Sequence, residues 1–243
     1  YYGTPYRYYA TVGGDVNIVL GKDGAQDGTC QLTMRSESLA GSLYSVIQGS
    51  VNVKINDGTK FGYETENASK DHDFYGMGYN DIVEGSVNIT MNGGEINGEL
   101  FGLGVTVGNS DGCHKIGRTD DPKEESYYYP KDALTITLNG GKVDNIVWFY
   151  NIRNSLQSKH IPHIYGNVII NINGGEVGCV YFGNPEKASP VDVTGYQLPY
   201  VNGTMGMELH ITGGTFTNVN QSVWAHSLTS VYKGQRILSL IHI

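Results

Sequence analysis

Two adjacent carboxylates, Asp120 and Asp121, have the residue type and spacing that catalysis could use. Glycoside hydrolysis needs a pair of carboxyl groups held about 5–10 Å apart, one of which acts as the general acid. The pair lies in a highly charged segment, residues 111–125. Such a segment is more typical of a solvated surface insertion. We therefore expect no catalytic residue in this chain, and Asp120 and Asp121 are the candidates under the enzymatic alternative.

A second acidic cluster, formed by Asp71, Asp73 and Asp81, could supply oxygen ligands to Ca²⁺. No glycine-punctuated calcium-binding loop with a closing Glu is visible in this segment, so we predict no cofactor, with Ca²⁺ at these three residues as the alternative. His160 and His163 could share a metal ion, but no Cys or acidic third ligand lies near them in the sequence. A surface loop is the preferred interpretation of the two histidines.

Aromatic residues provide candidates for ligand binding. Tyr127, Tyr128 and Tyr129 lie in the longest insertion, where aromatic side chains are hard to explain as core, and loops on rigid scaffolds often carry function. Trp148 follows a short apolar stretch and is the fourth candidate. The ligands that these residues suggest are a glycan or a host or cell-surface protein.

Composition excludes several classes of function. The chain has 243 residues and a net charge of −8, which disfavours nucleic-acid binding because phosphate contacts need basic residues. No run of 18 apolar residues exists, so we predict no membrane insertion. Phosphate-binding loops and nucleophile motifs are absent. The three cysteines, Cys30, Cys113 and Cys179, form no paired motif, and Cys179 is most simply a small buried residue.

The elements that must position these candidates form a repeat. Alternating apolar runs end five times in a turn of Asn-Gly-Gly type, at residues 51–58, 87–94, 134–141, 168–175 and 207–214, and a looser copy covers residues 16–24. An alternation with period two predicts a β-strand with one buried face. Repetition at intervals of 20–50 residues predicts a solenoid or a propeller.

A second apolar stretch follows several of these turns. The position two residues after the second glycine is apolar in four copies, whereas Lys60 breaks the pattern in the first. Seven residues after that glycine, three copies have an aromatic residue: Phe101, Trp148 and Phe182. Inside the fold these three would form an aromatic core column, which we prefer, and outside it a platform for sugar rings or a partner.

A strand, a glycine corner, a second strand and a variable loop describe one coil of a parallel β-helix. We therefore predict an all-β fold: a right-handed, single-stranded parallel β-helix of about six coils with variable insertions. A fragment of a β-propeller is the alternative, since its short strands would also alternate. The predicted inward column of the first strands is Val51, Val87, Leu134, Val168 and Met207.

The turn residues are interpreted as structural. Asn tolerates the left-handed region and Gly adopts it freely, so both suit a sharp corner. Equivalent Asn side chains in stacked coils can also bond to one another as a ladder, which Thr212 would end. The predicted structural turn residues are Asn56, Asn92, Gly93, Gly94, Asn139, Gly140, Gly141, Asn173, Gly174, Gly175, Gly213 and Gly214.

The repeat also predicts the domain organisation. Residues 1–13 form an N-terminal edge and residues 14–231 one β-helix domain, with units near 14–48, 49–84, 85–131, 132–165, 166–205 and 206–231. The chain starts at Tyr1 without an initiator Met, which indicates an internal fragment. Residues 232–243 form a tail, of which 238–243 resemble translated sequencing-adaptor read-through; a genuine terminal strand is the alternative.

Two repeat units, residues 89–102 and 170–184, carry a resemblance to a known family. They resemble the ITGGTIGNVYGGGN-type repeats of large surface proteins of gut bacteria, often from the Bacteroides and Prevotella group, over about residues 14–225. This chain departs from them where Phe-Gly-Leu-Gly or Tyr-Phe-Gly-Asn replaces Tyr-Gly-Gly-Gly. The resemblance implies export to the cell surface and a β-helix of the pectate-lyase-like superfamily, but no activity. The Gly-His-Gly and Arg-x-Lys motifs of the related pectinases do not occur here.

The sequence therefore predicts a fragment of an exported bacterial surface protein. Its expected role is that of an adhesin or scaffold that binds glycans, with neighbouring repeats of the longer protein as further partners. The alternatives are a polysaccharide lyase or glycoside hydrolase on the same fold, and a spacer that binds nothing.

Overall fold

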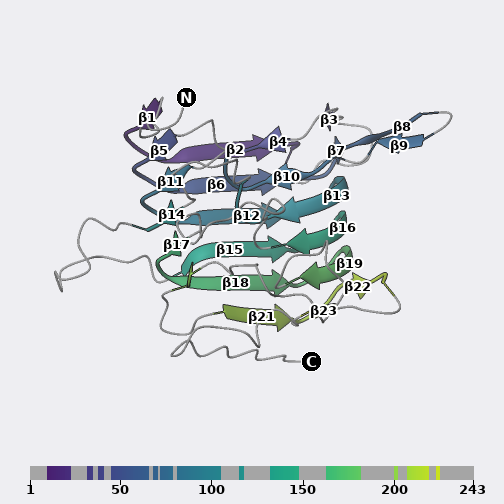
Figure 1. The fold of residues 1–243 in the computed structure, drawn as a ribbon. Helices are drawn as coiled ribbons and strands as arrows, with labels where there is room; N and C mark the ends of the chain where they lie inside the picture. Colours follow the sequence, from purple (N-terminus) through teal and green to yellow (C-terminus); the bar gives the residue numbers. More distant parts are fainter. Residues whose placement is uncertain are drawn as a thin grey trace, which may run out of the picture.

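Three parallel β-sheets run along a common axis in the computed structural model (Figure 1). The structure describes residues 10–22, 32–34, 38–40, 45–65, 68–70, 72–78, 81–104, 115–117, 132–147, 163–181, 200–201, 207–218 and 223–224. These residues form strands and short turns, and none of them is helical. Within this part of the chain we find no helix long and apolar enough to span a bilayer.

Sheet B contains the regular strands that the sequence predicts. Neighbouring strands pair in parallel, so that Val51, Val87, Leu134 and Val168 lie side by side and Met207 follows in register. In the strands at residues 51–55 and 87–91 a buried and a partly exposed residue alternate, and Val51, Val87, Leu134 and Val168 are fully buried, which confirms these four members of the predicted inward column. Met207 is placed by its register alone. In order across the sheet, the strands are β2 (Val16–Leu20), β6 (Val51–Ile55), β12 (Val87–Met91), β15 (Asp132–Leu138), β18 (Asn167–Ile172) and β21 (Met207–Ile211).

Sheet C contains the strands that follow the glycine corners. Three of its coils contribute two short strands instead of one. Between β7 and β10 lies the antiparallel hairpin of β8 (Tyr63–Thr65) and β9 (Ala68–Lys70). The strands of sheet C are β3 (Leu32–Met34), β4 (Ser38–Leu39), β7 (Thr59–Phe61), β10 (Phe74–Tyr75), β13 (Glu95–Phe101), β16 (Lys142–Val147), β19 (Glu176–Tyr181), β22 (Thr215–Phe216) and β23 (Val223–Trp224).

Sheet A closes each coil and was not predicted. Its strands have two or three residues, too few for an alternation to be recognised. A signal did exist, because Ile47, Val83 and Ile164 each stand three residues before a Ser-Val or Asn-Val pair, with a Gly between them. The strands of sheet A are β1 (Ala10–Val12), β5 (Ser45–Ile47), β11 (Ile82–Val83), β14 (Lys115–Ile116), β17 (His163–Ile164) and β20 (Tyr200–Val201).

The chain passes through sheets A, B and C in that order, again and again, which defines a parallel β-helix and confirms the predicted fold class. All pairings in the three sheets are parallel, whereas propeller blades are built from antiparallel strands, so the propeller alternative is wrong. One continuous core fills the interior. Phe61 of β7 and Phe74 of β10 pack edge to face in this core, with ring centroids 5.3 Å apart. This contact joins the two short strands on the inner face of the sheet.

The first glycine corner contains one residue more than the next. β12 pairs with β6 at an offset of 36 residues, whereas Glu95 and Ile96 pair with Lys60 and Phe61 at an offset of 35. Phe61, which is fully buried, therefore takes the inward position that the sequence assigned to Lys60. Lys60 does not break the pattern; it lies on the outer face beside Glu95.

Candidate functional site

The corners between sheets B and C hold the predicted asparagine ladder. Each amide donates to the Asn of the preceding coil: Asn92 to Asn56 at 3.0 Å, Asn139 to Asn92 at 2.9 Å and Asn173 to Asn139 at 2.9 Å. The Thr212 hydroxyl donates to Asn173 Oδ1 at 2.9 Å and takes the place of the next Asn. These Asn side chains are thus occupied with one another, as the structural interpretation expected.

The two glycines after each Asn have separate roles in the corner. Gly141 has φ of +83°, a conformation that costs other residues strain, and the four glycines at the equivalent bends, Gly58, Gly94, Gly175 and Gly214, have similar values. A Cβ on Gly140 would lie 2.5 Å from the carbonyl oxygen of Asn92, closer than real Cβ atoms come. The first glycine therefore permits close stacking of the coils, and the second permits the bend.

Two further polar ladders lie outside the corners, and the sequence did not predict them. On the outer face of sheet B, Asn88 donates to Asn52 at 2.9 Å and Asn52 to Asn17 at 3.0 Å. At the turns from sheet A to sheet B, the Ser86 amide donates to Ser50 Oγ at 3.1 Å and the Ser50 amide to Asp15 Oδ1 at 2.7 Å. The coils are thus bonded to one another by side chains at several places around their circumference.

The outer face of sheet C carries residues of alternating charge beside the glycine corners. In register across β7, β13, β16 and β19 lie Lys60, Glu95, Lys142 and Glu176, which we call the charged column. Thr33 precedes it on β3 and Thr215 follows it on β22. The sequence did contain a signal for this column, because in three copies the residue directly after the second glycine is charged. Apolar periodicity gives no information about that position.

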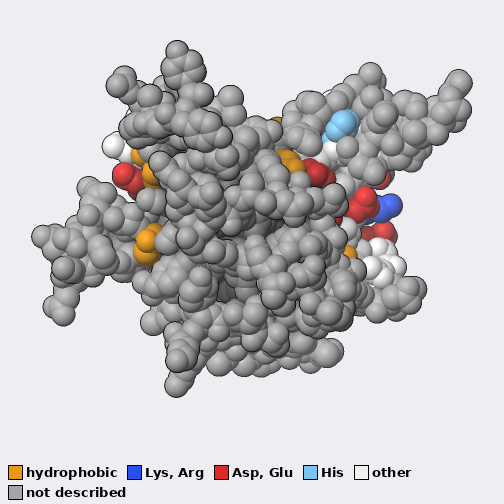
Figure 2. Space-filling model, viewed as in Figure 1, with side chains coloured by type: hydrophobic (Ala, Val, Ile, Leu, Met, Phe, Trp, Pro, Cys, Tyr) orange, Lys and Arg blue, Asp and Glu red, His pale blue; other side chains and the backbone are white. Residues whose placement is uncertain are grey.

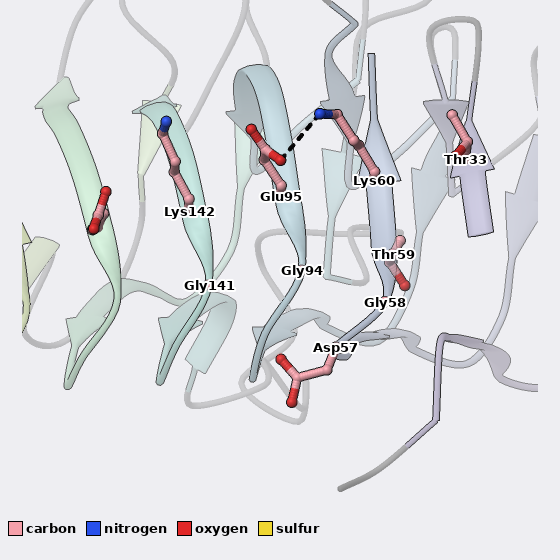
Figure 3. Close-up of a pocket in the computed structure, with 10 residues that line it drawn as sticks. Thr33, Asp57, Gly58, Thr59, Lys60, Gly94, Glu95, Gly141 and Lys142 are labelled. Carbon is pink, nitrogen blue, oxygen red and sulfur yellow. Dashed lines mark ion pairs between the residues drawn. The ribbon is translucent and has the colours of Figure 1, made fainter. Parts of the chain in front are cut away.

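A solvent-open hollow of about 740 Å³ runs beside the charged column. Figure 3 shows Lys60, Glu95 and Lys142 extending from neighbouring strands on one side of the sheet. In Figure 2, acidic and basic side chains lie together at the edge of the molecule where Figure 1 places these corners. The hollow is lined by Thr33, Asp57, Gly58, Thr59, Lys60, Gly94, Glu95, Gly141, Lys142 and Glu176.

The charges of the column are only partly neutralised. Lys60 Nζ and Glu95 Oε2 form an ion pair at 3.3 Å, with side chains 37% and 34% exposed. A pair this open to solvent contributes about 0.2–1 kcal/mol to stability. No ion pair of Lys142 or Glu176 exists within the described ranges. The Thr59 hydroxyl, buried in the lining of the hollow, has no hydrogen-bond partner. The site therefore offers unpaired polar groups of both signs in one row.

Two of the three predicted calcium ligands are bonded to the protein backbone. Asp81 is fully buried, and its carboxylate accepts the amides of Ser45 and Gly78 at 2.8 Å each. Asp73 accepts the Glu99 amide at 2.8 Å. Asp71 lies outside the described residues, so the trio stays a prediction. Among the residues that are described, no group of three His, Cys, Asp or Glu side chains could hold a metal ion.

The predicted aromatic column is wrong in its register. Gly98, at φ of +150°, adds one residue to β13, so that Phe101 pairs with Val147 rather than with the following Trp148. In the next coil the equivalent residue is Tyr181. Phe101 is buried but does not belong to the continuous core; its ring stacks on Tyr75 of the preceding coil, with centroids 4.7 Å apart.

Cys179 and Tyr181 lie on β19, which β16 separates from the strands of this aromatic stack. Cys179 is fully buried, as the sequence predicted. Burial raises the pKa of the Tyr181 phenol above its usual value, and the neighbouring Cys179 and Glu99 raise it further, because each disfavours a negative charge on the oxygen. Tyr181 therefore stays protonated in the folded chain to a higher pH than in the unfolded chain.

A carboxylate–imidazole pair occurs on β21 and was not predicted. His210 Nε2 lies 2.7 Å from Glu208 Oε2, and the residues, two apart in one strand, share the outer face of sheet B. Glu208 is 7% exposed, and its Oε1 has no hydrogen-bond partner. The only signal in the sequence was the polar positions of an alternating strand.

Most of the predicted functional residues cannot be compared with the structure. Tyr127, Tyr128, Tyr129, Trp148, Asp120, Asp121 and His160 lie outside the described residues, and for His163 only the backbone is described. The fold and the surface together define the class of protein: a parallel β-helix with a charged column and a polar hollow on one sheet. No family model matches the chain, and no curated protein or solved structure matches it.

Proposed function

We propose that this chain is a module of an exported bacterial surface protein, in which the β-helix acts as a scaffold and binds extended glycans. The observation that carries the proposal is the polar hollow beside the charged column. Its volume of about 740 Å³ falls in the range of ligand sites, roughly 300–1,000 Å³. Its lysine, glutamate and threonine side chains can exchange hydrogen bonds with sugar hydroxyls. Export and the surface location rest on the resemblance of the repeat.

The rigidity of the stack supports a scaffold role. Interior side chains in the middle coils are almost completely buried, and the ladders join each coil to the next. At the two ends the interior residues Val16, Ile18, Leu20, Ile211 and Phe216 are only partly buried. Further repeats of the same type are the partners that would cover them, because a coil presents the matching row of backbone and apolar groups.

Glycan binding is tested by applying the purified chain to an array of plant, bacterial and host glycans. We expect retention on linear polysaccharides and weaker retention on short branched ones, because the hollow extends over several coils. Failure to bind any glycan at millimolar concentration would favour the alternative of a spacer that binds nothing. Release of reducing ends or of unsaturated products from a bound glycan would instead assign the enzymatic alternative.

A further inference from the structure

The spacing of the charged column defines the length of a ligand repeat. Neighbouring strands of a sheet lie about 4.8 Å apart, so the four charged residues are spaced at that interval along the stack. Because the sign changes at each coil, like charges recur about every 9.6 Å. Lys60 and Lys142 form one series of this length, and Glu95 and Glu176 form the other.

Coil stacking alone does not explain the arrangement of these charges. If the column existed for cross-strand ion pairs, Lys142 would pair with a glutamate on either side. Within the charged column only Lys60 and Glu95 approach within ion-pair distance. Lys142 and Glu176 are exposed and line the hollow without such a partner. These groups are available to a ligand.

The repeat length distinguishes between classes of linear ligand. An extended peptide presents side chains on one face about every 6.7 Å, which matches neither the 4.8 Å step nor its double. An extended disaccharide of pyranose sugars advances by nearly two steps of the column. A glycan lying along the stack can therefore bring every second sugar opposite a lysine and the sugars between them opposite a glutamate.

We infer that the charged column binds a linear acidic polysaccharide whose disaccharide repeat carries a carboxylate on one sugar and an amine or acetamido N–H on the other. This rests on the glycan binding proposed above and names the substrate class. The carboxylates lie at Lys60 and Lys142, and the N–H donors lie at Glu95 and Glu176. A glycan with a carboxylate on every sugar fits less well, because half of its charges meet glutamates on a chain whose net charge is already −8.

Three oligosaccharides of equal length test the inference by calorimetric titration at low salt. They are a hyaluronan octasaccharide, which alternates glucuronate with N-acetylglucosamine, its N-deacetylated form and an octagalacturonate. We expect the N-deacetylated form to bind most tightly, hyaluronan less tightly and octagalacturonate least. Equal affinity for all three, or the reverse order, would overturn the inference.

Substitutions locate the binding on the column. Lys142→Gln should weaken hyaluronan binding about two- to fivefold, the range for one exposed charge pair. Lys54→Gln is the matched control, because Lys54 lies on sheet B and its loss changes the net charge equally. The double variant Lys60→Glu, Glu95→Lys keeps its ion pair and the composition but breaks the alternation, so it should abolish the preference for hyaluronan over octagalacturonate. Thermal unfolding of each variant confirms that it remains folded.

The outcomes separate this inference from the proposed function. Binding of array glycans that Lys142→Gln and the double variant leave unchanged would retain the glycan-binding module and refute the charged column as its site. Absence of binding to every glycan would refute both. Weakening by Lys54→Gln equal to that by Lys142→Gln would indicate a general charge effect and would also refute the site.

Discussion

The asparagine ladder predicts a loss of stability that depends on position. Asn92 Nδ2 donates to Asn56 Oδ1 and Asn92 Oδ1 accepts from Asn139, so Asn92→Ala removes two hydrogen bonds. Each contributes about 0.5–1.5 kcal/mol net. Asn56 is 1% exposed, and losing its donor leaves a buried oxygen unsatisfied, at a cost of about 1–3 kcal/mol. Because these contributions overlap, we expect a total loss of about 2–4 kcal/mol.

The matched control is Asn139→Ala. It also removes two ladder bonds, each of 2.9 Å, but Asn139 and its partner Asn173 are exposed, so water can replace what is lost. We expect a loss of about 1–2 kcal/mol here. Urea unfolding followed by circular dichroism gives both values, and the slope m should not change because the unfolded surface is the same. The reasoning is refuted if Asn92→Ala costs no more than Asn139→Ala, or less than about 1 kcal/mol.

Three further predictions concern the core, the corner and the pH dependence. Ile136→Ala, in a fully buried position of β15, should lower the free energy of unfolding in urea by about 2–5 kcal/mol; a loss below 1 kcal/mol would contradict the packed interior. Gly141→Ala should destabilise more than Gly14→Ala, because only Gly141 combines a φ of +83° with a carbonyl 2.6 Å from the new Cβ; equal melting temperatures would speak against the strained corner. Because the pKa of Tyr181 is raised in the folded chain, the unfolded phenol ionises first, and the free energy of unfolding should fall as the pH rises above 10. Tyr181→Phe should reduce the difference between the unfolding free energies measured in urea at pH 7 and at pH 11, and an unchanged difference would exclude the effect.

Sheet B and its corners were predictable because their signal is dense. Five residues of alternating polarity followed by a glycine pair specify a strand, its inward face and its end, and the register between coils follows from aligning the turns. The ladder followed from the same alignment, since Asn occupies one position in four copies.

Other features depend on single residues that shift a register. Gly98 adds one residue to β13. Counting seven residues from the second glycine of each copy therefore aligns Phe101 with Trp148, whereas in the sheet it pairs with Val147. The additional residue in the first corner exchanged the expected roles of Lys60 and Phe61. Each coil contributes one residue to the charged column, so no short stretch of the sequence contains two of its members. It becomes visible only when coils are placed side by side.

The ladders also give the stack a direction. Asn92, Asn139 and Asn173 each donate toward the preceding coil, and Asn52 and Asn88 do the same on the outer face of sheet B. The amide dipoles therefore add, as peptide dipoles do along an α-helix, and each bond polarises the next. At the Asn56 end the ladder terminates in an N–H group without an acceptor.

The two ends of the ladder are consequently not equivalent. The Asn56 end lies beneath the first coil and leaves a donor without an acceptor, whereas at the opposite end Thr212 supplies the donor to Asn173. We therefore expect any assembly along this axis to be head to tail, because a copy added in the reverse sense would place like dipoles against each other.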